Sequence, residues 1–124
     1  MAQKKAFQTQ SIEKVNADYG RIPPQAIELE EAVLGAIMVE RDAVIAVLDI
    51  LKPESFYKEA HQKIYKTIIS ISMDEKPIDI LTVTEQLRKD GELEKVGGAA
   101  YVTQLTSRVA SAAHLEFHAR IVAQ

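Results

Sequence analysis

The 124-residue sequence contains no cysteine, which excludes disulfide bonds, thiolate metal sites and cysteine nucleophiles. It also lacks an excess of positive charge. The formal net charge is −3, so the broad basic surface of a typical nucleic-acid-binding protein is missing. No apolar run reaches the roughly 20 residues that span a bilayer, and the first residues contain no apolar signal-peptide core. We therefore expect no contact with a membrane.

Motifs of catalysis are missing as well. The phosphate-binding pattern Gly-x-x-x-x-Gly-Lys-[Ser/Thr] does not occur, and neither does Gly-x-Ser-x-Gly. His114 and His118 are one helical turn apart, but two ligands do not complete a zinc site, and packing in a helix–helix seam explains the pair equally well. We expect no catalytic residue, no cofactor site and no metal site in this chain.

The composition, with 47% hydrophobic and 27% charged residues, is typical of one globular domain of this length. Residues 1–20 are polar and show no sustained periodicity, which predicts a flexible N-terminal tail. The periodic patterns begin after it, so the predicted domain covers residues 21–124.

The first predicted helix starts at Pro23 and Pro24, because proline fits the first turn of a helix. Apolar residues cover most of its circumference, while Glu28, Glu31 and Gly35 form a narrow opposite stripe. An apolar arc this wide predicts burial on several sides. We expect this helix to form the centre of a bundle.

Five further helices and no strand are expected, which predicts an all-α fold, a compact bundle of about six helices. The predicted ranges are 43–51, 58–73, 83–90, 99–109 and 112–124. Their boundaries are indicated by Asp42, a capping box of Thr82 with Glu85, a left-handed Gly91 and Ser111. Between the second and third helices, Phe56 and Tyr57 are expected to anchor a short turn in the core.

Two residues of the first helix are unusual. Glu30 falls between Val33 and Leu34 on the helical wheel, inside the apolar arc. A buried carboxylate is costly unless it finds donors, so we expect Glu30 to be a structural carboxylate that accepts backbone N–H bonds. Gly35 is unfavourable inside a helix, so we expect a core glycine at a close approach of another segment.

The last predicted helix has two apolar stripes. Leu115, Ala119 and Val122 form one, and Phe117 with Ile121 forms the other. A terminal helix that packs on one core needs only one such stripe. We therefore predict a self-association face that consists of Phe117, Ile121 and the nearby His114.

With these residues identified, residues 21–122 resemble the N-terminal domain of the bacterial replicative DNA helicase family, DnaB. The segment that contains Glu28, Glu30 and Gly35 is similar to the family pattern Pro-x-x-x-Glu-x-Glu-x-x-Val-Leu-Gly. A second segment matches the family's Phe-Tyr-x-x-x-His at residues 56–61. Two later stretches, residues 76–105 and 111–122, resemble the loop–helix–turn–helix that follows and the start of the family's hairpin helix.

The resemblance implies a helical collar module that pairs with its neighbours on top of a homohexameric ring of RecA-like motors in the bacterial cytoplasm. It also implies a surface for primase within the primosome, and a helicase loader as a further partner. The motor, with its ATP and magnesium and most of the DNA contacts, is absent from this chain, and the last helix would be the start of a helical hairpin.

Two alternatives remain open at this point. One is a free-standing helical interaction protein. The other is a small DNA-binding regulator, although the helix after Gly98 offers only Arg108 and a few hydroxyl groups for reading DNA.

Overall fold

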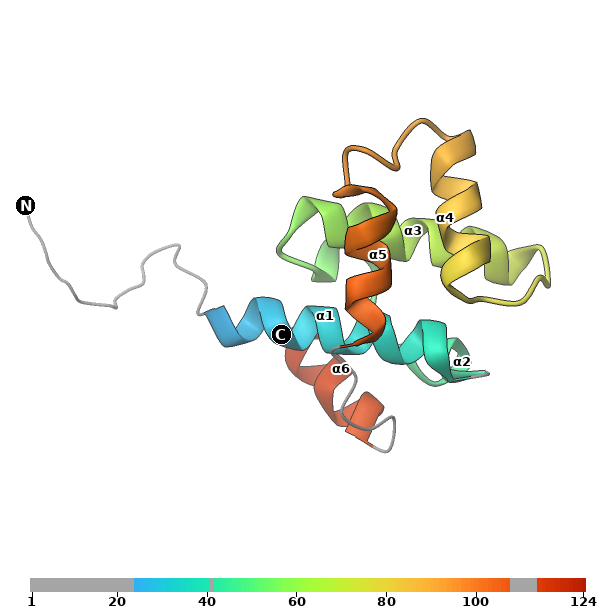
Figure 1. The fold of residues 1–124 in the computed structure, drawn as a ribbon. Coiled ribbons are helices and arrows are strands. Elements are labelled where there is room, and N and C mark those ends of the chain that lie inside the picture. Colours follow the sequence, from blue (N-terminus) through green and yellow to red (C-terminus); the bar gives the residue numbers. More distant parts are fainter. Residues whose placement is uncertain (1–23, 41, 108–113) are drawn as a thin grey trace, which may run out of the picture.

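The computed structural model describes residues 24–40, 42–107 and 114–124. Within these ranges the chain forms six α-helices, one short 3-10 helix (η1) and no strand (Figure 1). The elements are α1 (Pro24–Val39), α2 (Ala43–Val47), η1 (Pro53–Ser55), α3 (Glu59–Met73), α4 (Ile80–Lys89), α5 (Gly98–Thr106) and α6 (Leu115–Ala123). The predicted all-α fold is confirmed. The predicted tail, Pro23 and the Ser111 cap lie outside the described residues.

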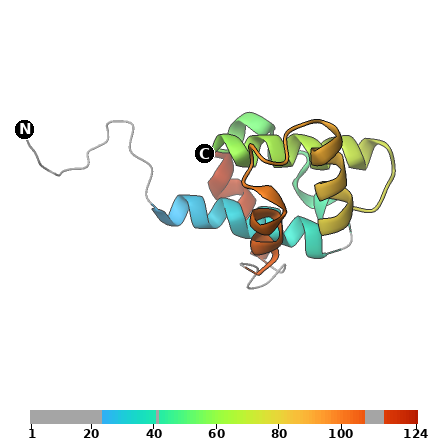
Figure 2. The ribbon, with the colours of Figure 1, turned by 45° about the horizontal axis from the view of Figure 1, so that its top comes forward.

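Helix α1 is the centre of the fold. It contacts α2, α3, α5 and α6, which lie around it in both views (Figure 1 and Figure 2). Its wide apolar arc is buried, as predicted. The opposite stripe is not a solvent face, however. Glu28 is exposed, but Glu31 is only 7% exposed and Gly35 is buried, because other helices cover this side as well.

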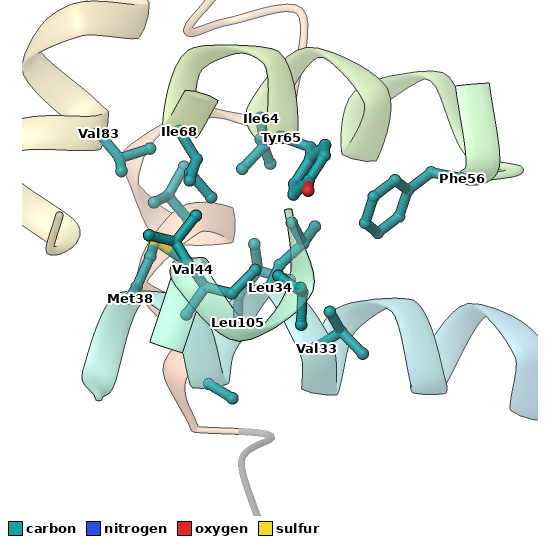
Figure 3. Close-up of a cluster of buried hydrophobic side chains, with 14 of the residues drawn as sticks. Val33, Leu34, Met38, Val44, Phe56, Ile64, Tyr65, Ile68, Val83 and Leu105 are labelled. Carbon is teal, nitrogen blue, oxygen red and sulfur yellow. The ribbon is translucent and has the colours of Figure 1, made fainter. Parts of the chain in front are cut away.

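The core fills the space between α1 and the helices that surround it. Figure 3 shows side chains of α1 facing those of α3, with Val83 of α4 and Leu105 of α5 beside them. Phe56 is 1% exposed and its ring lies 5.2 Å from that of Tyr65, which confirms its predicted place. Tyr57 is 60% exposed, so its prediction as a core anchor is wrong. Phe56 has an extended backbone, and successive side chains of an extended chain point to opposite sides.

Helix α4 is capped by a different box from the predicted one. The Asp79 carboxylate accepts the Thr82 N–H at 2.8 Å, and the Thr82 hydroxyl accepts the Asp79 N–H at 3.0 Å. Thr82 therefore lies inside the helix, and Glu85 pairs with Arg88 instead. The predicted left-handed end is confirmed at Gly91, whose φ is +72°.

Helix α2 is shorter than predicted. It ends at Val47, and the chain then turns so that Leu51 becomes buried and its carbonyl accepts the Tyr65 hydroxyl at 3.0 Å. Asp42 precedes the helix as predicted, but it has a φ of 67° and makes no side-chain capping bond. None of the described helices combines the length and the hydropathy that a membrane span requires.

Candidate functional site

The most elaborate polar arrangement among the described residues surrounds Glu30, on the central helix. Glu30 is 4% exposed. Its carboxylate accepts the Tyr57 N–H at 2.6 Å and, more weakly, the Lys58 N–H at 3.4 Å. These amides directly precede α3, where backbone donors have no intrahelical partner. The predicted burial of Glu30 and its predicted bonds to backbone donors are both confirmed.

Four more side chains complete what we call the buried polar cluster, which consists of Glu30, Glu31, Lys58, His61 and Tyr101. The His61 ring places Nδ1 2.7 Å from Glu30 Oε1 and Nε2 2.7 Å from the Tyr101 hydroxyl. That hydroxyl donates to Glu31 at 2.8 Å and accepts from the Lys58 ammonium at 3.2 Å. The cluster therefore connects α1, the start of α3 and α5.

The packing of the rings reinforces these bonds. His61 and Tyr101 are stacked, with their planes 8° apart and their centroids 6.0 Å apart. The Lys58 ammonium lies 4.5 Å above the centroid of the Tyr101 ring, a cation–π distance. Phe56 meets the edge of His61 at 6.3 Å between centroids. Buried polar groups that are bonded and packed in this way hold one arrangement of the core.

The Glu30–His61 pair has the form of a catalytic base with its orienting carboxylate. However, His61 is fully buried, and both of its ring nitrogens already have partners in the protein. A catalytic base must come within hydrogen-bond distance of the proton that it abstracts. We therefore assign the cluster to holding three helices together.

The described residues include no group of three or more histidine, cysteine, aspartate or glutamate side chains that could hold a metal ion. His114 and His118 have ring centroids 6.1 Å apart, with tilted planes. His118 also packs against Phe117, at 5.9 Å between centroids. The pair is thus part of an aromatic surface on α6.

The structure separates the two stripes of α6 as the sequence predicts. Leu115 and Ala119 are 5% and 0% exposed, whereas Phe117 and Ile121 are 64% and 40% exposed. His114 is exposed next to them. Phe117, Ile121 and His114 are called the α6 face below. The role of the α6 face in self-association stays a prediction.

Sequence reasoning missed most of the cluster. It gives the histidine at position 61 only as part of the family pattern, places Glu31 on the polar stripe and does not single out Tyr101. The bond between Tyr101 and Glu31 joins residues 70 positions apart, and no local pattern shows such a pair. The available signal was Glu30 itself, because a buried carboxylate needs partners from elsewhere.

Comparison with known proteins places this architecture in a family. Residues 22–124 match the family model described as the DnaB-like helicase N-terminal domain. The chain belongs to this family. The crystal structure of the N-terminal domain of DnaB helicase from Mycobacterium tuberculosis superimposes with a TM-score of 0.78 at 39% identity, over 82% of this chain and 74% of that one.

Two curated DnaB helicases are also similar to this chain in sequence. The replicative DNA helicase DnaB of Rhodothermus marinus is 50% identical over 113 residues, which is 91% of this chain and 12% of the relative. The DnaB of Geobacillus stearothermophilus is 44% identical over 102 residues, which is 82% of this chain and 22% of the relative. The chain thus spans less than a quarter of the length of these two relatives and corresponds to the N-terminal domain of replicative DnaB helicases.

The residues that resemble the DnaB patterns meet in the structure. Glu30 comes from the opening pattern, and Phe56, Tyr57 and His61 come from the second one. The backbone N–H of Tyr57 and the ring of His61 are what bind Glu30, while Phe56 packs on His61. In this chain these pattern residues fasten α1 to α3.

Proposed function

We propose that this chain is a non-catalytic assembly and docking domain of a replicative helicase. It pairs with a second copy within a homohexamer and offers a surface to primase during DNA replication in the bacterial cytoplasm. The observation that carries the proposal is the α6 face. Two large apolar side chains are exposed there, on a helix whose other side is packed into the core, and exposed apolar patches mark interaction sites.

The role of the α6 face is tested by sedimentation over a concentration series. The wild type is expected to associate weakly as its concentration rises, whereas Phe117→Asp stays monomeric because a charge in an apolar contact is not compensated. Leu81→Asp is the matched control, since Leu81 is 74% exposed on another helix, and it should sediment as the wild type does. A Phe117→Asp chain that still associates like the wild type contradicts the proposal.

The docking of primase is tested by mixing the chain with primase from the same organism and looking for co-sedimentation.

We expect neither ATP binding nor ATP hydrolysis by this chain, because the sequence has no phosphate-binding loop. ATP, magnesium and most DNA contacts are assigned to a motor domain, and a helicase loader is a further proposed partner. Turnover of ATP that a point mutation in this chain removes would contradict this division.

Two experiments distinguish the proposed helicase domain from the two alternative functions, a DNA-binding regulator and a free-standing interaction protein. A small DNA-binding regulator would bind duplex DNA with an affinity that falls steeply with salt, whereas we expect no such binding from a chain with a net charge of −3. A free-standing interaction protein would come from a gene without a downstream phosphate-binding loop. Sequencing the gene beyond the codon for Gln124 distinguishes it from a helicase domain.

A further inference from the structure

A second surface lies apart from the α6 face. A groove of about 590 Å³ lies between the α1–α2 turn and the α3–α4 loop. These two segments lie at the same end of the molecule in both views (Figure 1 and Figure 2). Its volume lies within the range of about 300–1,000 Å³ that is usual for binding sites. Buried Ile37, Met38 and Val44 contribute to its lining, and Val39 and Ile45 line it while 54% and 66% exposed. No residue of α6 lines it.

The charged residues among the described lining of this groove are mostly acidic. Among the described residues that line it, Glu40, Asp42, Glu75 and Asp79 are acidic and Lys76 is the one base. All five are exposed. A concave surface with this charge repels phosphate groups and attracts cationic side chains.

The backbone at two of these acids shows a further feature. Asp42 and Glu75, with φ values of 67° and 60°, are the two non-glycine residues with positive φ in the described part of the chain. The three other described positions of this kind are occupied by Gly91, Gly97 and Gly98. An L-residue is strained there relative to glycine, and neither carboxylate bonds to a described side chain. The conformation of Glu75 closes α3, where the Lys76 N–H bonds to the Ile71 carbonyl at 3.2 Å. The carboxylates of Asp42 and Glu75 are nevertheless exposed, and both residues line the same groove.

We infer that this groove binds an amphipathic, basic segment of a partner protein. Apolar side chains of the segment contact Val39 and Ile45, while its lysines or arginines lie near Asp42 and Glu75. A helix that presents apolar residues at i, i+3, i+4 and i+7 with cationic flanks has this chemistry. The inference goes beyond the proposed function, because it uses no residue of the α6 face.

The probe is a synthetic 16-residue peptide with leucines at that spacing and lysines elsewhere, titrated into the full 124-residue chain by calorimetry. A peptide of the same composition in scrambled order and a leucine–glutamate version serve as controls. We expect one-to-one binding of the leucine–lysine helix, weakened by salt, and no measurable binding of the glutamate version.

Variants locate the binding. Ile45→Asp should weaken it at least about tenfold, as expected for an anchor residue, and the double variant Asp42→Asn/Glu75→Gln should weaken it roughly fivefold, as expected for two exposed ion pairs. Glu94→Gln, an exposed acid outside the groove, and Phe117→Asp should bind as the wild type does. Glu75→Gly should weaken binding while its urea midpoint stays the same or rises, because glycine relieves the backbone strain.

Several results would overturn the inference. Equal binding to the wild type and to Ile45→Asp, or equal binding of the scrambled peptide, would mean non-specific attraction. Stronger peptide binding by a chain that lacks residues 1–20 would mean that the chain's own N-terminal segment fills the groove. Loss of self-association in Ile45→Asp would assign the groove to a second copy. Because Phe117→Asp tests the α6 face separately, failure here leaves the proposed function untouched.

Discussion

Replacement of Glu30 by alanine is the most direct test of the buried polar cluster. The change removes the acceptor for the Tyr57 N–H at 2.6 Å and for His61 Nδ1 at 2.7 Å. A buried donor left without a partner costs about 1–3 kcal/mol. The Lys58 bond is long, at 3.4 Å, and adds little.

Access of water decides how much of this cost remains. Glu30 lines a shallow groove of about 460 Å³ together with Tyr57, so water can reach the Tyr57 N–H in the variant. His61 is fully buried, so its ring nitrogen stays unsatisfied. The expected loss in the free energy of unfolding is therefore about 3 kcal/mol, the upper end of the range for a buried donor left without a partner.

Urea denaturation measures this loss. At a slope of about 2 kcal/mol per molar, the midpoint should fall by about 1.5 M. Glu28→Ala is the matched control, because Glu28 is exposed on the same helix. Its free energy of unfolding should differ from that of the wild type by less than about 0.5 kcal/mol. In a double-mutant cycle, Glu30→Ala and His61→Ala should be coupled by about 0.5–3 kcal/mol. If Glu30→Ala and Glu28→Ala denature at the same midpoint, or if the cycle is additive, the role assigned to the cluster is wrong.

Three further predictions concern stability. Gly97 has a φ of +114°, and a Cβ there would lie 2.8 Å from the Tyr101 Cβ, so Gly97→Ala should cost about 2 kcal/mol or more by urea denaturation. Gly98→Ala, at φ +79° with open space around it, should cost less, and equal losses would refute the predicted clash. Asp79→Ala should cost about 1 kcal/mol by removing the cap of α4, and an unchanged midpoint would show that the cap is dispensable. Burial raises the pKa of the Tyr65 hydroxyl from 10.0 to about 12, so the unfolded chain loses this proton first and stability should fall between these two pH values. The decline should be smaller in Tyr65→Phe, and identical pH slopes for the two chains would contradict it.

The sequence determined those features that depend on local geometry. Helical periodicity predicted the all-α fold and the central place of α1, because a helix that is apolar on most sides must be covered on most sides. The same reasoning separated the buried and exposed stripes of α6, with Leu115 inside and Phe117 outside. A left-handed end at Gly91 was equally readable, since glycine adopts positive φ without a steric cost.

Other features depended on which segments meet, and only the tertiary structure decided them. The periodicity placed Glu30 on a buried face but did not name His61, 31 residues away, as its partner. It also put Glu31 on the outside, where Tyr101 of α5 covers it. Tyr57 contributes its backbone N–H instead of its ring, because the extended backbone at Phe56 sends the two neighbouring side chains to opposite sides. A repeat of 3.6 residues tells which side of a helix is apolar, whereas bonds across 31 to 70 residues exist only once the helices are packed.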